Sequence, residues 1–423
     1  ASSEVTPSSK TQITIKGINL DVAGGITVQL YDSNGAAYGS AAPIDTSHTG
    51  RELTTLTVDI PIPSDEGVFT AKVLFGGVIQ TSYYEGYSYN SENTVTNPTI
   101  QVYGSPKFTS FKIPNAGISK EDAVVTAVVK GANFKAPGVT ASNFSVSCTT
   151  ASITNGSKFT IIDDSTLKVT LTIPGTVGNY TVTVTCGSAS IAVTFSVKDY
   201  TNWTVGKIVL AGKTLKSKDE YTAIDSDNPP VAIICGTDEY GVAIGIALHT
   251  SKQGLEWAKK DSTGYNTRFE GIICIATGDK ASTATFTNGG DTYGGDNWEY
   301  ICSIDSEGAT NVAENYPAFN WVNTYNTTYA DKLGSARPSW YMPSLAELCQ
   351  VYKNKEAVNE SLLKINGSAS SYADASLGTG DFWSSSQYSY YNKVAWHVEF
   401  GSGFLNDVNC KDFNSNVCCI AGF

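Results

Sequence analysis

The clearest structural signal in the chain is the stretch WYMPSLAEL at residues 340–348. Ser344 in this stretch is followed three residues later by Glu347, the spacing of a capping box, in which each side chain hydrogen-bonds the backbone N–H of the other residue. Apolar side chains then recur at helical spacing, at Leu345, Leu348, Val351 and Tyr352. The sequence therefore predicts a helix that begins after Ser344 and buries this stripe.

The region around this helix, residues 202–423, has the pattern of a mixed α/β domain. All seven tryptophans of the chain lie beyond residue 200, so the composition changes there. The predicted elements are strands at 205–210, 231–235 and 241–248, and further helices near 252–260 and at 313–325.

The first 200 residues are instead rich in Val, Thr, Ile, Ser and Gly. Apolar and polar side chains alternate there in short runs separated by turn residues, as at 12–15, 56–60 and 167–171. Such evenly spaced short strands are typical of all-β sandwiches.

This first part also contains an internal repeat. KGINL at 16–20 returns as KGANF at 130–134, and the pattern of residues 55–70 returns at 166–181. The offsets of 114 and 111 residues match about one sandwich domain. The motifs resemble the IPT/TIG-type and related immunoglobulin-like modules of bacterial surface proteins. The predicted organisation is a polar tether at 1–10, followed by immunoglobulin-like domains at 11–105 and 106–200.

A second resemblance covers residues 202–423. Its motifs are the helix stretch at 340–348, FWSSS at 382–386, AWHVEF at 395–400 and the ending VCCIAGF at 417–423. In this order they resemble the C-type-lectin-like domain, related to formylglycine-generating enzymes, at the end of bacterial surface and fimbrial proteins. Within that group the chain is most similar to the variable proteins of diversity-generating retroelements, of which the Treponema variable protein is one.

The resemblance implies a ligand-binding scaffold with a variable region at about 384–419. Many residues in this region are types whose codons arise from an asparagine codon when its adenines are replaced. The resemblance implies that diversity is made by this replacement. Trp396, Val398 and Phe400 alternate with His397 and Glu399, so we expect one face of this strand in the core and the other toward a partner. The predicted exposed contact residues are Tyr388, Tyr390, Tyr391, His397, Glu399, Phe404, Asn406, Asp407, Asn409, Asp412, Phe413 and Ser415.

The expected fold class is therefore multidomain, with two all-β immunoglobulin-like sandwiches followed by a mixed α/β C-type-lectin-like domain. The expected partner is a protein or glycan on another cell or host surface, bound without a cofactor and without catalysis. A net charge of −12 and a pI near 4.8 argue against a nucleic-acid partner. We expect a monomer.

The chain opens with a polar stretch and no initiator, and its one methionine is Met342. This predicts an exported protein, displayed on the cell surface or secreted, whose processed N-terminus could carry a lipid anchor as in an outer-membrane lipoprotein. No apolar run approaches the roughly 20 residues that a membrane-spanning helix needs. The same domain also suits a fixed-specificity adhesin, a fimbrial tip subunit or a phage receptor-binding protein.

Three further features of the sequence concern its cysteines and one acidic loop. Cys410, Cys418 and Cys419 could form a redox or metal set, but no histidine lies beside them at ligand spacing. Asp291, Asp296 and Glu299 could form a metal loop, although a solvated acidic loop is the simpler interpretation. Nine cysteines are an odd number, and Cys148 and Cys186 could form a disulfide.

Overall fold

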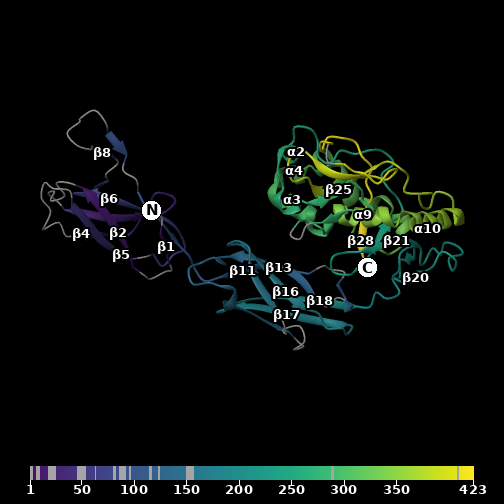
Figure 1. Ribbon diagram of the computed structural model, residues 1–423, viewed down its shortest axis with the longest axis horizontal. Helices are drawn as coiled ribbons and strands as arrows, with labels where there is room; N and C mark the ends of the chain where they lie inside the picture. The colour runs from purple at the N-terminus through teal and green to yellow at the C-terminus, as the bar shows by residue number, and fades with distance from the viewer. Residues whose placement is uncertain are drawn as a thin grey trace. The chain divides into compact units, whose positions relative to one another are not determined.

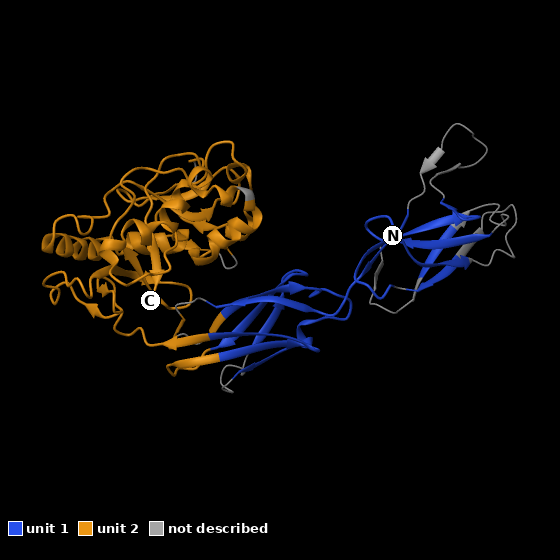
Figure 2. Cartoon of the chain, turned by 180° about the vertical axis from the view of Figure 1, so that it is seen from behind, with its two compact units in different colours: residues 1–113, 126–172, 181–194 blue, residues 114–125, 173–180, 195–423 orange. Residues whose placement is uncertain are grey.

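The computed structural model describes residues 3–5, 10–17, 25–44, 54–61, 63–79, 82–84, 92–94, 97–113, 117–121, 124–148, 157–286, 290–406 and 409–423. The chain is mostly β-sheet with some helices (Figure 1). By its internal contacts the chain divides into two compact units (Figure 2). These units are residues 1–113, 126–172 and 181–194, and residues 114–125, 173–180 and 195–423.

The first β-sandwich packs a larger sheet against a two-stranded one. The larger sheet has the order β1 (Ser3–Val5), β10 (Thr99–Val102), β6 (Gly67–Phe75), β3 (Ile26–Tyr31) and β4 (Ala37–Ile44), with β7 (Val78–Ile79) beside β6. The smaller sheet pairs β2 (Lys10–Gly17) with β5 (Thr54–Pro61), and β8 (Ser82–Tyr84) pairs with β9 (Glu92–Thr94). Alternate side chains of both sheets, such as Val28, Val58 and Phe69, share one core.

The position of β1 corrects the expected tether at 1–10. Ser3, Glu4 and Val5 pair in parallel with Ile100, Gln101 and Val102 of β10. An edge strand needs only backbone N–H and C=O groups for its ladder, so a polar composition does not prevent pairing.

The second sandwich consists of two four-stranded sheets. One has the order β11 (Lys107–Lys112), β13 (Val124–Ala132), β16 (Thr166–Thr172) and β15 (Lys158–Ile161). The other has the order β12 (Ile118–Ser119), β18 (Ala189–Lys198), β17 (Gly178–Cys186) and β14 (Phe144–Cys148), and a short 3₁₀ turn, η1 (Ala141–Asn143), precedes β14.

The sequence repeat places related residues on corresponding strands. The pattern at 55–70 lies on β5 and β6, and its copy at 166–181 lies on β16 and β17. A Cβ at Gly131 would lie 1.9 Å from the Lys107 carbonyl oxygen, and Asn133 has a φ of 63°. The Lys-Gly-x-Asn motif therefore places glycine where a neighbouring carbonyl leaves no room for a side chain. It places asparagine where the backbone is left-handed. Residues 18–20 of the first copy lie outside the described residues.

The considered disulfide between Cys148 and Cys186 is wrong. Cys148 lies opposite Val182 on β17, whereas Cys186 lies opposite Phe144 on β14. Four strand residues separate the two positions, about 13 Å at the usual rise per residue, and a disulfide needs Cα atoms within about 7 Å. All nine cysteines lie in the described part of the chain, and no disulfide forms among them.

The C-terminal part is built on a five-stranded antiparallel sheet. Its order is β20 (Leu215–Lys216), β19 (Ile208–Leu210), β21 (Pro230–Thr237), β22 (Ala243–Ala247) and β28 (Ile420–Gly422). The chain's last strand thus pairs with β22, and a second sheet orders β25 (Asp381–Gln387), β26 (Ala395–Glu399) and β27 (Leu405–Asn406). A small hairpin pairs β23 (Ala276–Thr277) with β24 (Thr285–Phe286).

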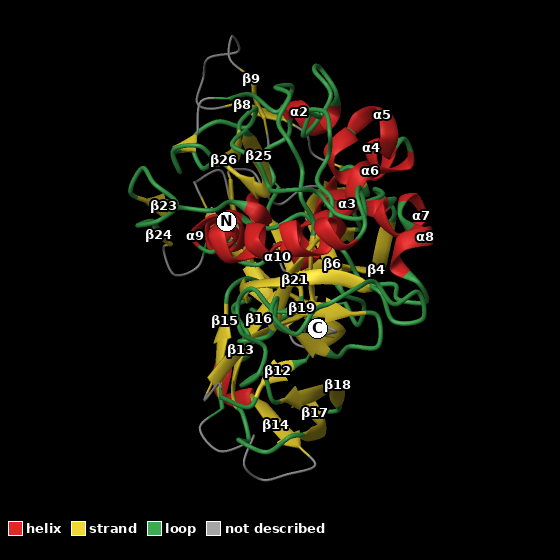
Figure 3. Ribbon diagram, turned by 90° about the vertical axis from the view of Figure 1, so that its right-hand side faces the viewer, coloured by secondary structure: helices red, strands yellow, loops and turns green. Residues whose placement is uncertain are grey.

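Helices and 3₁₀ turns surround these sheets (Figure 3). The two longest are α9 (Leu345–Lys353) and α10 (Lys355–Ser368), which both pack against β21. The others are α2 (Thr263–Asn266), η2 (Glu270–Ile272), η3 (Gly294–Asp296), α3 (Asn297–Ile304), α4 (Ser306–Thr310), α5 (Val312–Asn315), α6 (Pro317–Asn323), α7 (Tyr325–Thr328) and α8 (Ala330–Leu333). Among the described residues, no helix combines the length and apolar character needed to cross a membrane.

The predicted capping box at α9 is confirmed. The Ser344 side chain accepts a hydrogen bond from the Glu347 N–H, and the Glu347 carboxyl accepts from the Ser344 N–H at 2.9 Å. Leu345, Leu348 and Val351 are fully buried on the predicted face.

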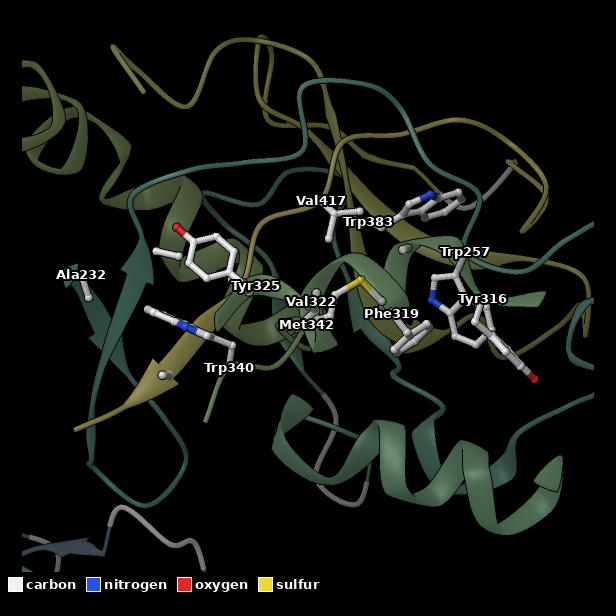
Figure 4. Close-up of a cluster of buried hydrophobic side chains, with 14 of the residues drawn as sticks. Ala232, Trp257, Tyr316, Phe319, Val322, Tyr325, Trp340, Met342, Trp383 and Val417 are labelled. Carbon is white, nitrogen blue, oxygen red and sulfur yellow. The ribbon is translucent and has the colours of Figure 1, made fainter. Parts of the chain in front are cut away.

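The helix predicted near residues 252–260 is absent from this described segment. Its backbone instead contacts the last part of the chain: Leu255 bridges Ser415, and the Ala258 N–H donates to the Lys411 carbonyl. The Trp257 indole N–H donates to the Ser384 carbonyl at 3.0 Å. These long-range bonds satisfy the backbone groups that a helix would have used. Trp257 packs in the core beside Tyr316 and Phe319 (Figure 4).

Two acidic side chains support the start of α9 from the inside. The Glu347 carboxyl also accepts from the Gly294 N–H and the Tyr341 hydroxyl, and Asp291 accepts from Asn297 and Ser386. Burial raises the pKa of Glu347 to about 8 and that of Asp291 to about 7. Both values lie well above the ordinary carboxyl pKa of about 4.

The C-terminal part should therefore lose stability as the pH rises from 5 to 7. Across this range the folded state holds protons that the unfolded state has released, so each group lowers the free energy of unfolding by up to about 1.4 kcal/mol per pH unit. Urea unfolding followed by tryptophan fluorescence measures this, because every tryptophan lies beyond residue 200. Glu347→Gln, which does not titrate, should have a shallower slope; a stability that rises over this pH range would contradict the assignment.

Candidate functional site

In the part of the chain that the structure describes, exposed aromatic side chains lie in one stretch. Among the described residues, the exposed Tyr, Phe and Trp side chains are Tyr390 at 77%, Tyr391 at 65%, and Phe404 and Phe413 at 44% each. All four were predicted contact residues. Large aromatic groups are costly to leave in water, so this stretch is the candidate contact surface. We call residues 388–413 the aromatic segment.

The two exposed tyrosines rest on a buried aromatic base. The ring of half-buried Tyr388 lies 5.4 Å from that of Tyr390 and 6.2 Å from that of Tyr391. On its other side Tyr388 meets the buried Trp396 edge to face at 5.0 Å, and the Trp396 indole donates to the Cys274 carbonyl. The exposed rings are therefore attached to the core through a chain of ring contacts.

Polar bonds fix the loop between β25 and β26 that carries these tyrosines. The Gln387 side chain donates to the Asn392 carbonyl at 3.1 Å and closes the loop. Arg268 donates to the Ser389 carbonyl and Asn392 to the Asn266 carbonyl. A loop tied at both ends and at its middle loses little conformational entropy when it binds.

Most of the other predicted residues lie in β26 or after it in the chain. Phe404 lies under the ammonium of Lys280, 5.1 Å from its ring centroid, in a segment that bridges Lys280 through the backbone. The Phe413 N–H donates to the Cys410 carbonyl at 2.8 Å. The half-exposed predicted residues are Tyr388, Glu399, Asn406, Asn409 and Asp412. Asp407 lies outside the described residues.

Two predicted contact residues are wrong: His397 has 0% and Ser415 has 2% of its surface exposed. Alternation along β26 does not separate exposed from buried side chains, because the strand is covered on both faces. His397 meets the ring of Trp383 at 5.3 Å on one side, while Val398 and Phe400 enter the core on the other. Strands buried on both faces do not divide into a wet and a dry side. The prediction that Trp396, Val398 and Phe400 enter the core is confirmed.

Sequence reasoning missed the residue that holds this surface together, Lys411. Its side chain is fully buried, and its ammonium donates to the Gly264 and Thr267 carbonyls at 2.9 Å and to the Gln387 side-chain oxygen at 3.4 Å. It also lies 4.7 Å from the Trp257 ring centroid and 4.9 Å from that of Phe269. Burial lowers its pKa to about 7. No local pattern signals this role, because lysine is normally exposed.

Of the three cysteines considered as a redox or metal set, two lie in the core. Cys418 and Cys419 are fully buried, and burial raises the pKa of Cys418 to about 12 and that of Cys419 well above its ordinary value. A thiol that stays protonated is neither a nucleophile nor a metal ligand. In the described residues, no group of three or more His, Cys, Asp or Glu side chains is arranged to hold a metal ion.

The acidic loop differs from the solvated loop expected from the sequence. Asp296 and Glu299 are exposed, but Asp291 turns inward. Its carboxyl accepts from the Asn297 amide and the Ser386 hydroxyl, both at 2.8 Å, and so ties the segment before α3 to β25.

No protein-family model matches the chain, and no curated protein matches it in sequence. Among solved structures, a fimbrial protein from Bacteroides ovatus aligns with 100% of this chain and 95% of its own, at 12% identity and a TM-score of 0.37. An I-band fragment of titin aligns over 47% of this chain and 62% of its own, at 13% identity and a TM-score of 0.20. Domains 4 and 5 of the S-layer protein SbsC align over 45% and 98%, at 15% identity and a TM-score of 0.20. These TM-scores are too low to assign the fold of either unit.

Replacing Lys411 should destabilise the C-terminal part selectively. Lys411→Met keeps the side-chain length but leaves the Gly264 and Thr267 carbonyls without their donor, at a cost of about 1–3 kcal/mol in the free energy of unfolding. Tryptophan-monitored urea unfolding measures this. Lys393→Met, at an exposed lysine of the same segment, should stay within about 0.5 kcal/mol of wild type. If the two substitutions lower the free energy of unfolding equally, the hydrogen bonds of Lys411 do not hold these segments together.

Proposed function

We propose that this protein is a surface-displayed ligand-binding protein. Its C-terminal part would be a C-type-lectin-like scaffold whose aromatic segment contacts a protein or glycan on another cell or host surface. The two N-terminal sandwiches, as immunoglobulin-like modules, would present this scaffold away from the membrane. The proposal includes export to the cell surface, with or without a lipid anchor, a monomeric state, and neither a cofactor nor catalysis.

The observation that carries the proposal is that, among the described residues, the exposed aromatic side chains all lie within residues 390–413. Tyrosine on a fixed loop supplies a large contact area at a small cost in side-chain entropy. Half-exposed Asn406, Asn409 and Asp412 add polar groups to the same segment of the chain.

The proposal further includes diversification of this segment by a retroelement. Positions that could vary without loss of folding are exposed or half-exposed, and the fixed framework is buried. Lys411, Gln387 and Trp396 belong to the framework. His397 and Ser415, though reachable from an asparagine codon, are buried and should therefore be held constant.

Deep sequencing of the 3′ end of the gene across a clonal population tests the diversification. We expect adenine-templated substitutions at exposed codons such as those of Tyr390, Tyr391 and Phe413, few at His397 and Ser415, and a nearby reverse transcriptase with a near-duplicate template. A uniform 3′ end without such a cassette would leave a fixed-specificity adhesin, a fimbrial tip subunit or a phage receptor-binding protein as the better proposal.

A separate binding experiment tests the contact surface. Fluorescently labelled protein is applied to a panel of bacterial and animal cells and bound protein is measured by flow cytometry. Tyr390→Ala/Tyr391→Ala should weaken binding at least about tenfold, because exposed aromatic anchors dominate interface energies. Leu363→Ala, which removes a 62% exposed apolar side chain on α10, should bind as wild type. Unchanged binding by the double variant would show that the partner contacts another surface.

A further inference from the structure

A cavity of about 490 Å³ lies in the second compact unit, and none of the predicted contact residues lines it. Its volume is within the range of small-molecule sites. Its walls combine three cationic side chains, Lys198, Lys213 and Arg337, with the aromatic side chains of Tyr293, Trp340 and Tyr341. A protein with a net charge of −12 here gathers positive charge in a concave site.

Within the protein, the Arg337 guanidinium donates to the Gly334 and Ala336 carbonyls at 2.8 and 2.7 Å. In the part of the chain that the structure describes, none of the three cationic side chains forms an ion pair with a carboxylate. Asp238, the only carboxylate side chain on the wall, already accepts from the Tyr240 and Val242 N–H groups at 2.8 and 2.9 Å. The Phe423 carbonyl oxygen, also at the wall, accepts from the Tyr200 hydroxyl at 2.5 Å.

Two features at the rim are unfavourable in the protein alone. Burial and the nearby positive charge of Lys213 both lower the pKa of Lys198, so the two ammonium groups repel each other. Lys213 also has a left-handed backbone, with φ of 60°, in the turn that follows β19. Left-handed backbone costs a non-glycine residue free energy, and such strain collects at functional sites. A bound anion would relieve the repulsion.

The aromatic wall indicates that the anion carries a ring. Tyr293 and Tyr341 lie 5.7 Å apart, and both are half-buried with part of their surface toward the cavity. Trp340 is fixed by the bond from its indole N–H to Asn326 at 3.0 Å and by its contact with Tyr325 (Figure 4). Rigid rings beside cations form a surface for a flat or puckered ring with a negative substituent.

We propose that this cavity binds a small organic anion, a sugar-sized ring that bears a carboxylate or sulfate group. Lys198, Lys213 and Arg337 would neutralise the charged group, and Trp340, Tyr293 and Tyr341 would contact the ring. This site is separate from the aromatic segment, so the two proposals can fail independently.

Isothermal titration of the full chain at low ionic strength tests the site with three probes: glucuronate, glucose and inorganic sulfate. Glucuronate should bind at least about tenfold more tightly than either of the other two, because it alone carries both the ring and the charge. Raising the salt concentration should weaken binding. Equal binding of glucuronate and glucose, or no binding of glucuronate, would overturn the proposal.

Two variants separate binding from folding. Lys213→Gly removes the charge and relaxes the left-handed backbone, so it should raise the midpoint of thermal unfolding while weakening glucuronate at least about fivefold. Arg337→Ala should weaken glucuronate binding to a similar degree. Lys260→Ala, at an exposed lysine away from the cavity, is the charge-matched control and should bind as wild type. An equal loss in the control, or undiminished binding by Lys213→Gly, would show that the cavity is not the site.

Discussion

The candidate surface depends on one buried cation. The Lys411 ammonium joins the 264–267 turn to Gln387 and to its own segment, and Trp257 and Phe269 flank it with their rings. A buried charge is tolerated only where it is well hydrogen-bonded, and here each of its three N–H groups has an oxygen acceptor. This requirement fixes the positions of three chain segments that are far apart in sequence. The exposed tyrosines occupy the loop that these segments hold.

This arrangement separates the buried framework from the exposed loop. The core side chains of β25 and β26 pack on both faces of the sheet, so changes in the exposed loop need not disturb them. Tyr388 links the two zones, since its ring touches Trp396 on one side and the exposed tyrosines on the other. The charged cavity beside Trp340 lies among different residues, so a second ligand could bind without using the loop.

Local patterns predicted the elements whose determinants lie close together in sequence. The α9 capping box, the buried stripe after it and the strands of the repeated sandwiches all follow from spacings of a few residues. The exposure of Tyr390, Tyr391, Phe404 and Phe413 was also predicted, although on the basis of a family resemblance. The helix expected near 252–260 does not form, because backbone hydrogen bonds to Lys411 and Ser415 take the place of local ones.

The sequence by itself determined the change of fold near residue 200, the repeat, the main helix and the segment rich in exposed aromatic groups. Only the tertiary structure decided that His397 and Ser415 are buried, that Lys411 is a framework residue, and that Lys198, Lys213 and Arg337 line one cavity. The physical reason is that periodicity reports a side chain's direction along one strand or helix. Burial and charge pairing depend on which distant segments cover it, and spacing along the chain does not contain that information.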